Sequence, residues 1–161
     1  MTLLEICEWL EQTSLARLIQ ESLYGFPLVV AVHLLGLTFS VGTLLWVDLR
    51  MLGLVFVETP VSQVYRSLAP WFLFGFALML ASGTTLFVSF ASAAYENGYF
   101  RFKMVAMVLA GVNALAFHFL VPRDSDPLST PPFAVRVAGL TSILLWASVV
   151  LAGRMMSYTM F

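Results

Sequence analysis

Four long apolar stretches separated by polar segments dominate the chain. They cover about residues 24–46, 70–92, 102–121 and 134–156. Each is long enough to cross a hydrocarbon core of about 30 Å at about 1.5 Å per residue. Backbone groups in lipid must hydrogen-bond within their own segment, and the alternation typical of a transmembrane barrel is not visible. The pattern therefore predicts four transmembrane helices.

The segment of about residues 2–22 has a different pattern. Glu5, Glu8 and Glu11 are interleaved with apolar residues such as Leu3 and Trp9 at helical spacing. This spacing predicts an amphipathic helix that lies in the membrane interface. A helix that covers the end of the bundle is an equally good interpretation.

Aromatic residues divide the expected bundle into two ends, because Tyr and Trp favour the boundary between membrane and water. One end, which we call side A, holds Tyr24, Tyr95, Tyr99 and Tyr158. The opposite end, side B, holds Trp46, Tyr65 and Trp71. The eight Lys and Arg residues divide evenly between the two sides, so charge does not predict the orientation.

The connections between the spans carry turn signals. Thr59 and Pro60 read as the N-cap and first position of a short helix that ends near Leu68, after which Pro70 opens the second span. Asn97-Gly98 predicts a turn, and the polar, proline-rich segment 122–132 predicts a loop.

Composition supports this interpretation and excludes several classes of protein. Of the 161 residues, 60% are hydrophobic and 11% are charged, with a mean hydropathy of +0.92. A soluble domain is about 45–50% apolar and about 25% charged. The net charge of −1 argues against a nucleic-acid partner, and the single cysteine excludes a disulfide framework within the chain. We therefore expect residues 1–161 to form a single domain, an all-α polytopic protein with the lipid bilayer as its first partner.

His33 and His118 are the candidate ligands for a metal or cofactor, because an ionisable group within a span is costly unless it has a role. The alternative for each is a neutral imidazole that hydrogen-bonds a neighbouring helix. His33 shares a stripe with Gly36, Ser40 and Thr43, where small residues leave space. His118 shares a stripe with Met104, Met107, Gly111 and Ala114. Such stripes can form the walls of a porphyrin site, although methionines at helical spacing more often only pack.

The depths of the two histidines limit a shared site. His33 lies about 14 Å and His118 about 24 Å from side A, at about 1.5 Å per residue. Helix axes are about 8–10 Å apart, so one haem iron bound by both rings is marginal. If a cofactor is bound, we expect His33→Ala to abolish binding and His118→Ala to weaken it or merely to shift its spectrum, because His118 is nearer to water at side B.

Other polar residues in or near the spans favour structural roles. Asp48 and Arg50 lie two positions apart and do not face each other on a helix, so each should find a partner elsewhere, such as Arg66 or Glu58. Asn113, in the middle of the third span, predicts a hydrogen bond between helices. Arg101 and Lys103, where the third span begins, can reach lipid headgroups or bind a propionate or phosphate.

The stretch ESLYGFPLVVAVHLLGLTFSVGTLLWVDLRMLGL, with His33-x-x-Gly36 and the Asp-Leu-Arg-x-Leu-Gly run from Asp48 to Gly53, resembles a bacterial family of four-helix inner-membrane proteins with no assigned function. Phe100 to His118 is similar to the same family's third span. The resemblance covers nearly the whole chain and implies a multi-pass protein of the bacterial inner membrane. More loosely, histidine followed by glycine on the first span resembles copper-resistance D-type proteins and membrane b-type cytochromes, which implies one haem b at most.

Three functions follow as hypotheses. The first is a b-type-cytochrome-like electron-transfer subunit of a larger membrane complex. The second is a non-redox structural or assembly subunit, and the third is copper transport or handling, with His33, His118, Met104 and Met107 as ligands. Phosphate-loop, zinc-protease and serine-hydrolase motifs are absent from the sequence, so we expect no enzyme activity from the chain alone. Protein partners, in a complex or a homo-oligomer, are expected instead.

Overall fold

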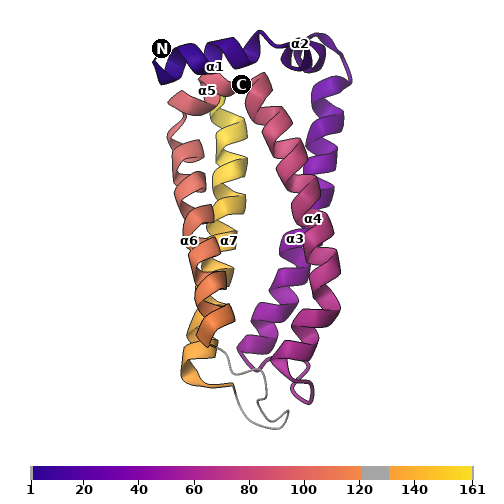
Figure 1. The fold of residues 1–161 in the computed structure, drawn as a ribbon, viewed down its shortest axis with the longest axis vertical. Helices are drawn as coiled ribbons and strands as arrows, with labels where there is room; N and C mark the ends of the chain where they lie inside the picture. Colours follow the sequence, from indigo (N-terminus) through magenta and orange to yellow (C-terminus); the bar gives the residue numbers. More distant parts are fainter. Residues whose placement is uncertain (1, 121–130, 161) are drawn as a thin grey trace.

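The computed structural model describes residues 2–120 and 131–160, except for the side chains of residues 118 and 120. All regular structure in this part of the chain is helical. The helices long and apolar enough to span a membrane are α3 (Gly25–Met51), α4 (Val61–Ser89), α6 (Gly98–Leu120) and α7 (Phe133–Met160). The predicted all-α, four-span architecture is confirmed (Figure 1). The loop predicted for residues 122–132 falls almost entirely outside the described residues.

The N-terminal segment forms two helices rather than one, α1 (Leu3–Glu11) and α2 (Ser14–Glu21). The break occurs because Thr13 caps α2, its hydroxyl accepting from the Ala16 N–H at 3.4 Å. Both helices lie across side A of the bundle (Figure 1). Gln20 donates to the Ser89 carbonyl at 2.6 Å, and the Ser92 N–H donates to Glu11 at 2.8 Å. The segment therefore covers the end of the bundle.

Proline has a different role from the predicted one in α4. Pro60 is the N-cap, and the helix then runs without interruption through Pro70. A helical proline leaves the carbonyl four residues earlier without its donor. Here that carbonyl belongs to Arg66, an exposed residue near side B, where water can satisfy it. A separate short helix before the second span is therefore not formed.

The spans pack as two pairs. α3 packs mainly on α4 and α6 mainly on α7, and the two pairs meet chiefly through α3 and α7. In the first pair the backbones touch: a Cβ on Gly36 would lie 2.9 Å from the Gly75 carbonyl oxygen and from the Met79 nitrogen. Small residues allow this close approach of helices in lipid.

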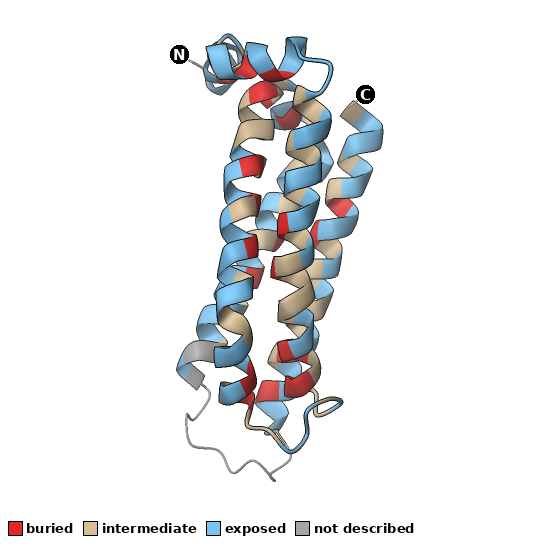
Figure 2. Cartoon of the chain, turned by 90° about the vertical axis from the view of Figure 1, so that its right-hand side faces the viewer, coloured by how far each residue is buried: buried red, intermediate tan, exposed pale blue. Residues whose placement is uncertain are grey.

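Burial is uneven along the bundle. A cluster of buried side chains closes side B, with partly buried neighbours that include Leu68 and Phe117. Its members are Val47, Met51, Val61, Val64 and Val135. Buried positions face inward, whereas the outward faces of the spans are exposed and apolar, as contact with lipid acyl chains requires (Figure 2).

Candidate functional site

A cavity of about 440 Å³ opens between the two helix pairs toward side A. All four spanning helices contribute to its wall. Its apolar lining includes the rings of Phe26, Phe87, Phe90 and Phe100. Its polar and small residues include His33, Gly83, Lys103, Gly153 and Arg154. An apolar cavity with a few convergent polar groups is the usual form of a small-molecule site, and this volume lies within the usual range of about 300–1,000 Å³.

His33 is hydrogen-bonded to α4, and the bonds of Ser82 favour one tautomer of its ring. Its Nδ1 lies 2.9 Å from the Ser82 hydroxyl oxygen. That hydroxyl has a single proton, which it donates to the Leu78 carbonyl within its own helix. Ser82 therefore accepts from His33, and the ring proton is assigned to Nδ1. The lone pair of Nε2 is left free to accept a hydrogen bond or to bind a metal.

Gly83 provides the space that the His33 ring occupies. A Cβ at position 83 would lie 3.1 Å from His33 Cε1, closer than side chains normally pack. The Nδ1 and Cε1 edge of the ring is thus seated against α4. The backbone of Met79, also on α4, forms a further hydrogen bond with the ring. Among the described residues, no side chain is hydrogen-bonded to Nε2. A histidine that donates one ring nitrogen to a neighbouring acceptor and keeps the other free has the arrangement of most metal-binding histidines.

Two cations line the same cavity. Lys103, on α6, is partly buried, and its Nζ would lie 3.6 Å from a Cβ on Gly153 of α7. Arg154 lies on the exposed side, donates to the Tyr158 hydroxyl at 2.8 Å and stacks over that ring at 4.7 Å. These positions give the cavity a positive charge beside an apolar interior.

Gly36 lies outside the cavity. The space predicted beside it is filled by α4, because Gly36 and Gly75 bring the two backbones into contact. The same contact buries Ser40 completely. The stripe that begins at His33 therefore divides its roles: the histidine faces the cavity, and the glycine and serine below it pack against α4.

The predicted methionine and glycine wall of α6 also lies outside the lining of this cavity. α6 buries Ala106 and Ala110 instead, whereas Met104 and Gly111 are exposed. A Cβ on Gly111 would meet nothing within 4 Å. Met107 is partly buried but does not contact the cavity. The inward-facing residues of α6 therefore lie about one position before the predicted ones. One position corresponds to a rotation of about 100° around the helix axis.

His118 belongs to the other end of the bundle. It lies in α6, fifteen positions after Lys103, or about 22 Å along the axis at about 1.5 Å per residue. Its neighbour Phe117 packs on the side B cluster. The side chain of His118 is outside the described residues. Among those residues, no group of three or more His, Cys, Asp or Glu side chains is arranged to hold a metal ion.

The run from Asp48 to Gly53 closes α3 and ties it to its surroundings. The N–H of Leu54 donates to the Leu49 carbonyl at 3.0 Å, and that of Gly53 donates to the Arg50 carbonyl at 2.9 Å. These two bonds form a Schellman C-cap, which needs a left-handed residue, and Gly53 has a φ of +78°. Glycine is therefore required at this position for conformational reasons.

The two charged residues of this run are buried and bonded separately. Arg50 is 2% exposed and donates to the carbonyls of Thr59 (2.7 Å) and Val57 (3.3 Å). Asp48 is 3% exposed and receives a side-chain hydrogen bond from Ser142 of α7. Neither forms an ion pair with Glu58 or Arg66 in the described structure, so these suggested partners were wrong. Asp48 and Arg50 do not bond each other, as their separation of two positions on a helix predicts.

Asn113 bonds the second helix pair. Its Nδ2 donates to the Ala138 carbonyl of α7 at 3.0 Å.

The sequence did not reveal the partners of His33 on α4, because Ser82 and Gly83 read as ordinary small residues of an apolar span. Lys103 was identified as a cation for a propionate or phosphate, but not as a neighbour of His33.

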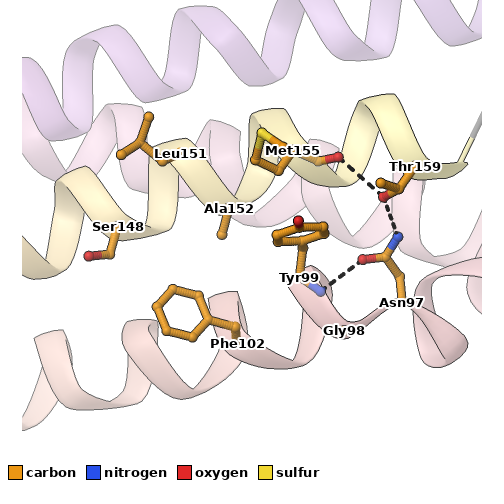
Figure 3. A pocket seen from close by; sticks show the side chains of 9 residues that line it. All are labelled: Asn97, Gly98, Tyr99, Phe102, Ser148, Leu151, Ala152, Met155 and Thr159. Atoms are coloured by element: carbon orange, nitrogen blue, oxygen red, sulfur yellow. Dashed lines mark hydrogen bonds between the residues drawn. The ribbon is translucent and has the colours of Figure 1, made fainter.

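A second, open groove of about 700 Å³ follows α6 and α7 on their outer surface near side A (Figure 3). Its lining includes Phe102, Leu151 and Met155, and it has no charged residue. Asn97 bridges the helices by donating to the Thr159 hydroxyl at 2.8 Å (Figure 3). The groove carries no acid, base or nucleophile with a perturbed environment, so the cavity beside His33 is the better candidate site.

The fold and this cavity define a class, the polytopic α-helical membrane proteins. Residues 6–159 match the model of a family of unknown function, DUF6644, and the chain belongs to that family. The match agrees with the resemblance drawn from the sequence to a family without an assigned function. No curated protein and no solved structure matches the chain.

Proposed function

We propose that this protein binds one haem b in the side A cavity, that Nε2 of His33 would hold its iron, and that the protein transfers electrons as a small cytochrome-like subunit. The observation that carries the proposal is the His33–Ser82 hydrogen bond, which leaves Nε2 as the free nitrogen in an apolar cavity. When bound, haem iron supplies reversible one-electron chemistry tuned by its axial ligands and their hydrogen bonds.

The cavity has the donor set that such a group requires. Phenylalanine rings offer apolar faces for a macrocycle, and Lys103 and Arg154 offer charges for its propionates. Glycines at 83 and 153 keep the space open, because larger side chains would enter it from opposite walls. Met79, Met156 and Met160 also line the cavity, and thioether sulfur is the other common axial ligand in cytochromes.

The rest of the function lies with a partner. The described connections between spans are short, so a substrate site would have to come from another protein. We place the protein in the inner membrane of a bacterium, as a subunit of a larger complex or as a homo-oligomer.

The absorption spectrum of the purified protein after haem-supplemented expression tests the proposal. We expect a Soret band and a pyridine-haemochrome signal near one haem per chain in the wild type. His33→Ala should lose both. His118→Ala is the matched control, because it removes a histidine from the opposite end, and it should keep the band. No Soret band in the wild type, or its retention in His33→Ala, would overturn the assignment.

Copper handling is the second candidate, because three methionines share the cavity with His33. Imidazole and thioether together suit Cu(I). These thioethers differ from the Met104 and Met107 pair suggested by the sequence. Metal analysis that finds stoichiometric copper without iron, lost in His33→Ala, would favour this function. Neither metal in the wild type would favour a structural or assembly subunit.

A further inference from the structure

Lys103 places an ammonium group inside the spanning part of the bundle. It is partly buried on α6, and its Nζ reaches the surface of α7 at Gly153. Charged groups at this depth pair with other groups or mark a ligand pathway, because an unpaired charge in an apolar environment is costly.

The described residues supply no counter-ion for it. The acidic residue within the described spans is Asp48, which lies at side B and is bonded to Ser142. Lys103 forms no ion pair or hydrogen bond with any described residue. Among residues 2–120 and 131–160, nothing balances the positive charge of the cavity beside His33.

Arg101, on the same helix, is placed differently from Lys103. Only two positions away, it is exposed, and it donates to the Glu96 carbonyl at 3.5 Å, outside the cavity. It has the placement of a residue that reaches the membrane surface. Lys103 instead turns into the bundle, where Gly153 leaves room for it.

Arg154 extends the positive charge outward. Its guanidinium is held over the Tyr158 ring, on the exposed side of the cavity. A cation on the exposed side and a second one further in favour the approach of an anion from side A. The phenylalanine-lined interior then accommodates an apolar body attached to that anion.

We propose that Lys103 binds the acidic group, a carboxylate or a phosphate, of an amphipathic ligand whose apolar part occupies the cavity beside His33. Where that ligand is haem, the inference rests on the proposed function and assigns Lys103 to a propionate. The same chemistry is offered by the phosphate of an anionic lipid. Lys103 is then a determinant of ligand class, selecting acidic over neutral amphiphiles.

Haem and haem dimethyl ester, in which both propionates are blocked, test the first source with the full-length protein in neutral detergent. A hydrogen bond to a charged group is worth about 1.5–3 kcal/mol, so we expect the wild type to bind haem at least about tenfold more tightly than the ester. Lys103→Gln should lose most of this preference, because only Arg154 remains to contact a propionate. Lys103→Arg and Arg101→Gln should keep the preference.

Lipid retention tests the second source. The same variants are reconstituted in phosphatidylcholine containing phosphatidylglycerol, re-extracted in neutral detergent and examined by native mass spectrometry. If lipid is the ligand, the wild type, Lys103→Arg and Arg101→Gln retain phosphatidylglycerol and Lys103→Gln loses it. Added haem should displace this lipid if both use the site.

The outcomes separate this inference from the haem proposal. Lipid retention that depends on Lys103, without any haem binding, supports the anion site and overturns the haem assignment. Haem binding through His33 that is identical in Lys103→Gln and the wild type, with equal lipid retention, overturns the anion site and leaves the haem assignment standing. Equal preference loss in Arg101→Gln would show a general charge effect and also overturn the anion site.

Discussion

The two ends of the bundle treat buried polar groups in opposite ways. At side B, Arg50 and Asp48 are nearly inaccessible, and each is bonded to groups of the protein itself. At side A, His33 and Lys103 line a cavity, no described side chain is hydrogen-bonded to Nε2 of His33, and the ammonium of Lys103 has no partner among the described residues. Polar groups that the protein satisfies hold helices together, whereas polar groups that it leaves unsatisfied are available for a ligand. Substitutions at side B should therefore change stability, and substitutions at side A should change binding.

Arg50→Leu should cause the largest loss of stability. It removes a buried charge and leaves the carbonyls of Thr59 and Val57 without donors. We expect the free energy of unfolding in mixed micelles to fall by about 3 kcal/mol. Arg66→Leu, at an exposed position nearby, should change it by less than about 0.5 kcal/mol. Equal effects of the two substitutions would contradict the role assigned to the side B bonds.

Gly75→Ala should rank next. Its Cβ would collide with the backbone nitrogen of Ser40, so α3 and α4 would have to separate. Overpacking of this kind costs about 1–3 kcal/mol. Gly42→Ala is the control, because a Cβ there meets nothing within 4 Å. Thermal unfolding of both variants in the same detergent measures the difference, and a Gly75→Ala variant as stable as Gly42→Ala would show that the helices are not in contact at this point.

Asn113→Ala should have a smaller effect. It removes one hydrogen bond between α6 and α7, worth about 1 kcal/mol in a membrane bundle. Ser148→Ala removes a side-chain bond only to its own helix, at the Leu144 carbonyl, and should be near neutral. Chemical unfolding of the pair resolves the two cases. A larger loss for Ser148→Ala would argue against Asn113 as a bond between the helices.

The spans could be predicted from the sequence more easily than the contacts between them. Length and apolar composition were enough to predict four spanning helices, because backbone groups in lipid must hydrogen-bond within their own segment. The glycines were harder, because the sequence does not distinguish a glycine that allows helix contact, Gly36, from one that leaves space for a ring, Gly83. That distinction depends on which helix faces contact each other. On α6 the predicted inward face was wrong by one residue, so Met107 and Gly111 do not line the cavity.

Gly153→Ala should have the smallest effect on stability. A Cβ at this cavity wall would make only ordinary contact, 3.6 Å from Lys103 Nζ. Replacing glycine by alanine inside a helix stabilises it by up to about 1 kcal/mol. Unfolding measurements should therefore find no loss. A loss as large as that of Gly75→Ala would mean that this wall of the cavity is packed as tightly as the contact between α3 and α4 at Gly75.

Nuclear magnetic resonance of isotope-labelled histidine ring nitrogens measures whether His33 presents a free Nε2 to a haem site. The chain has two histidines, so His118→Gln leaves the signal of His33 alone. We expect a proton on Nδ1 and a bare Nε2 without ligand, and loss of the His33 signals when ferric haem is added. A proton on Nε2, or signals unchanged by haem, would contradict this expectation.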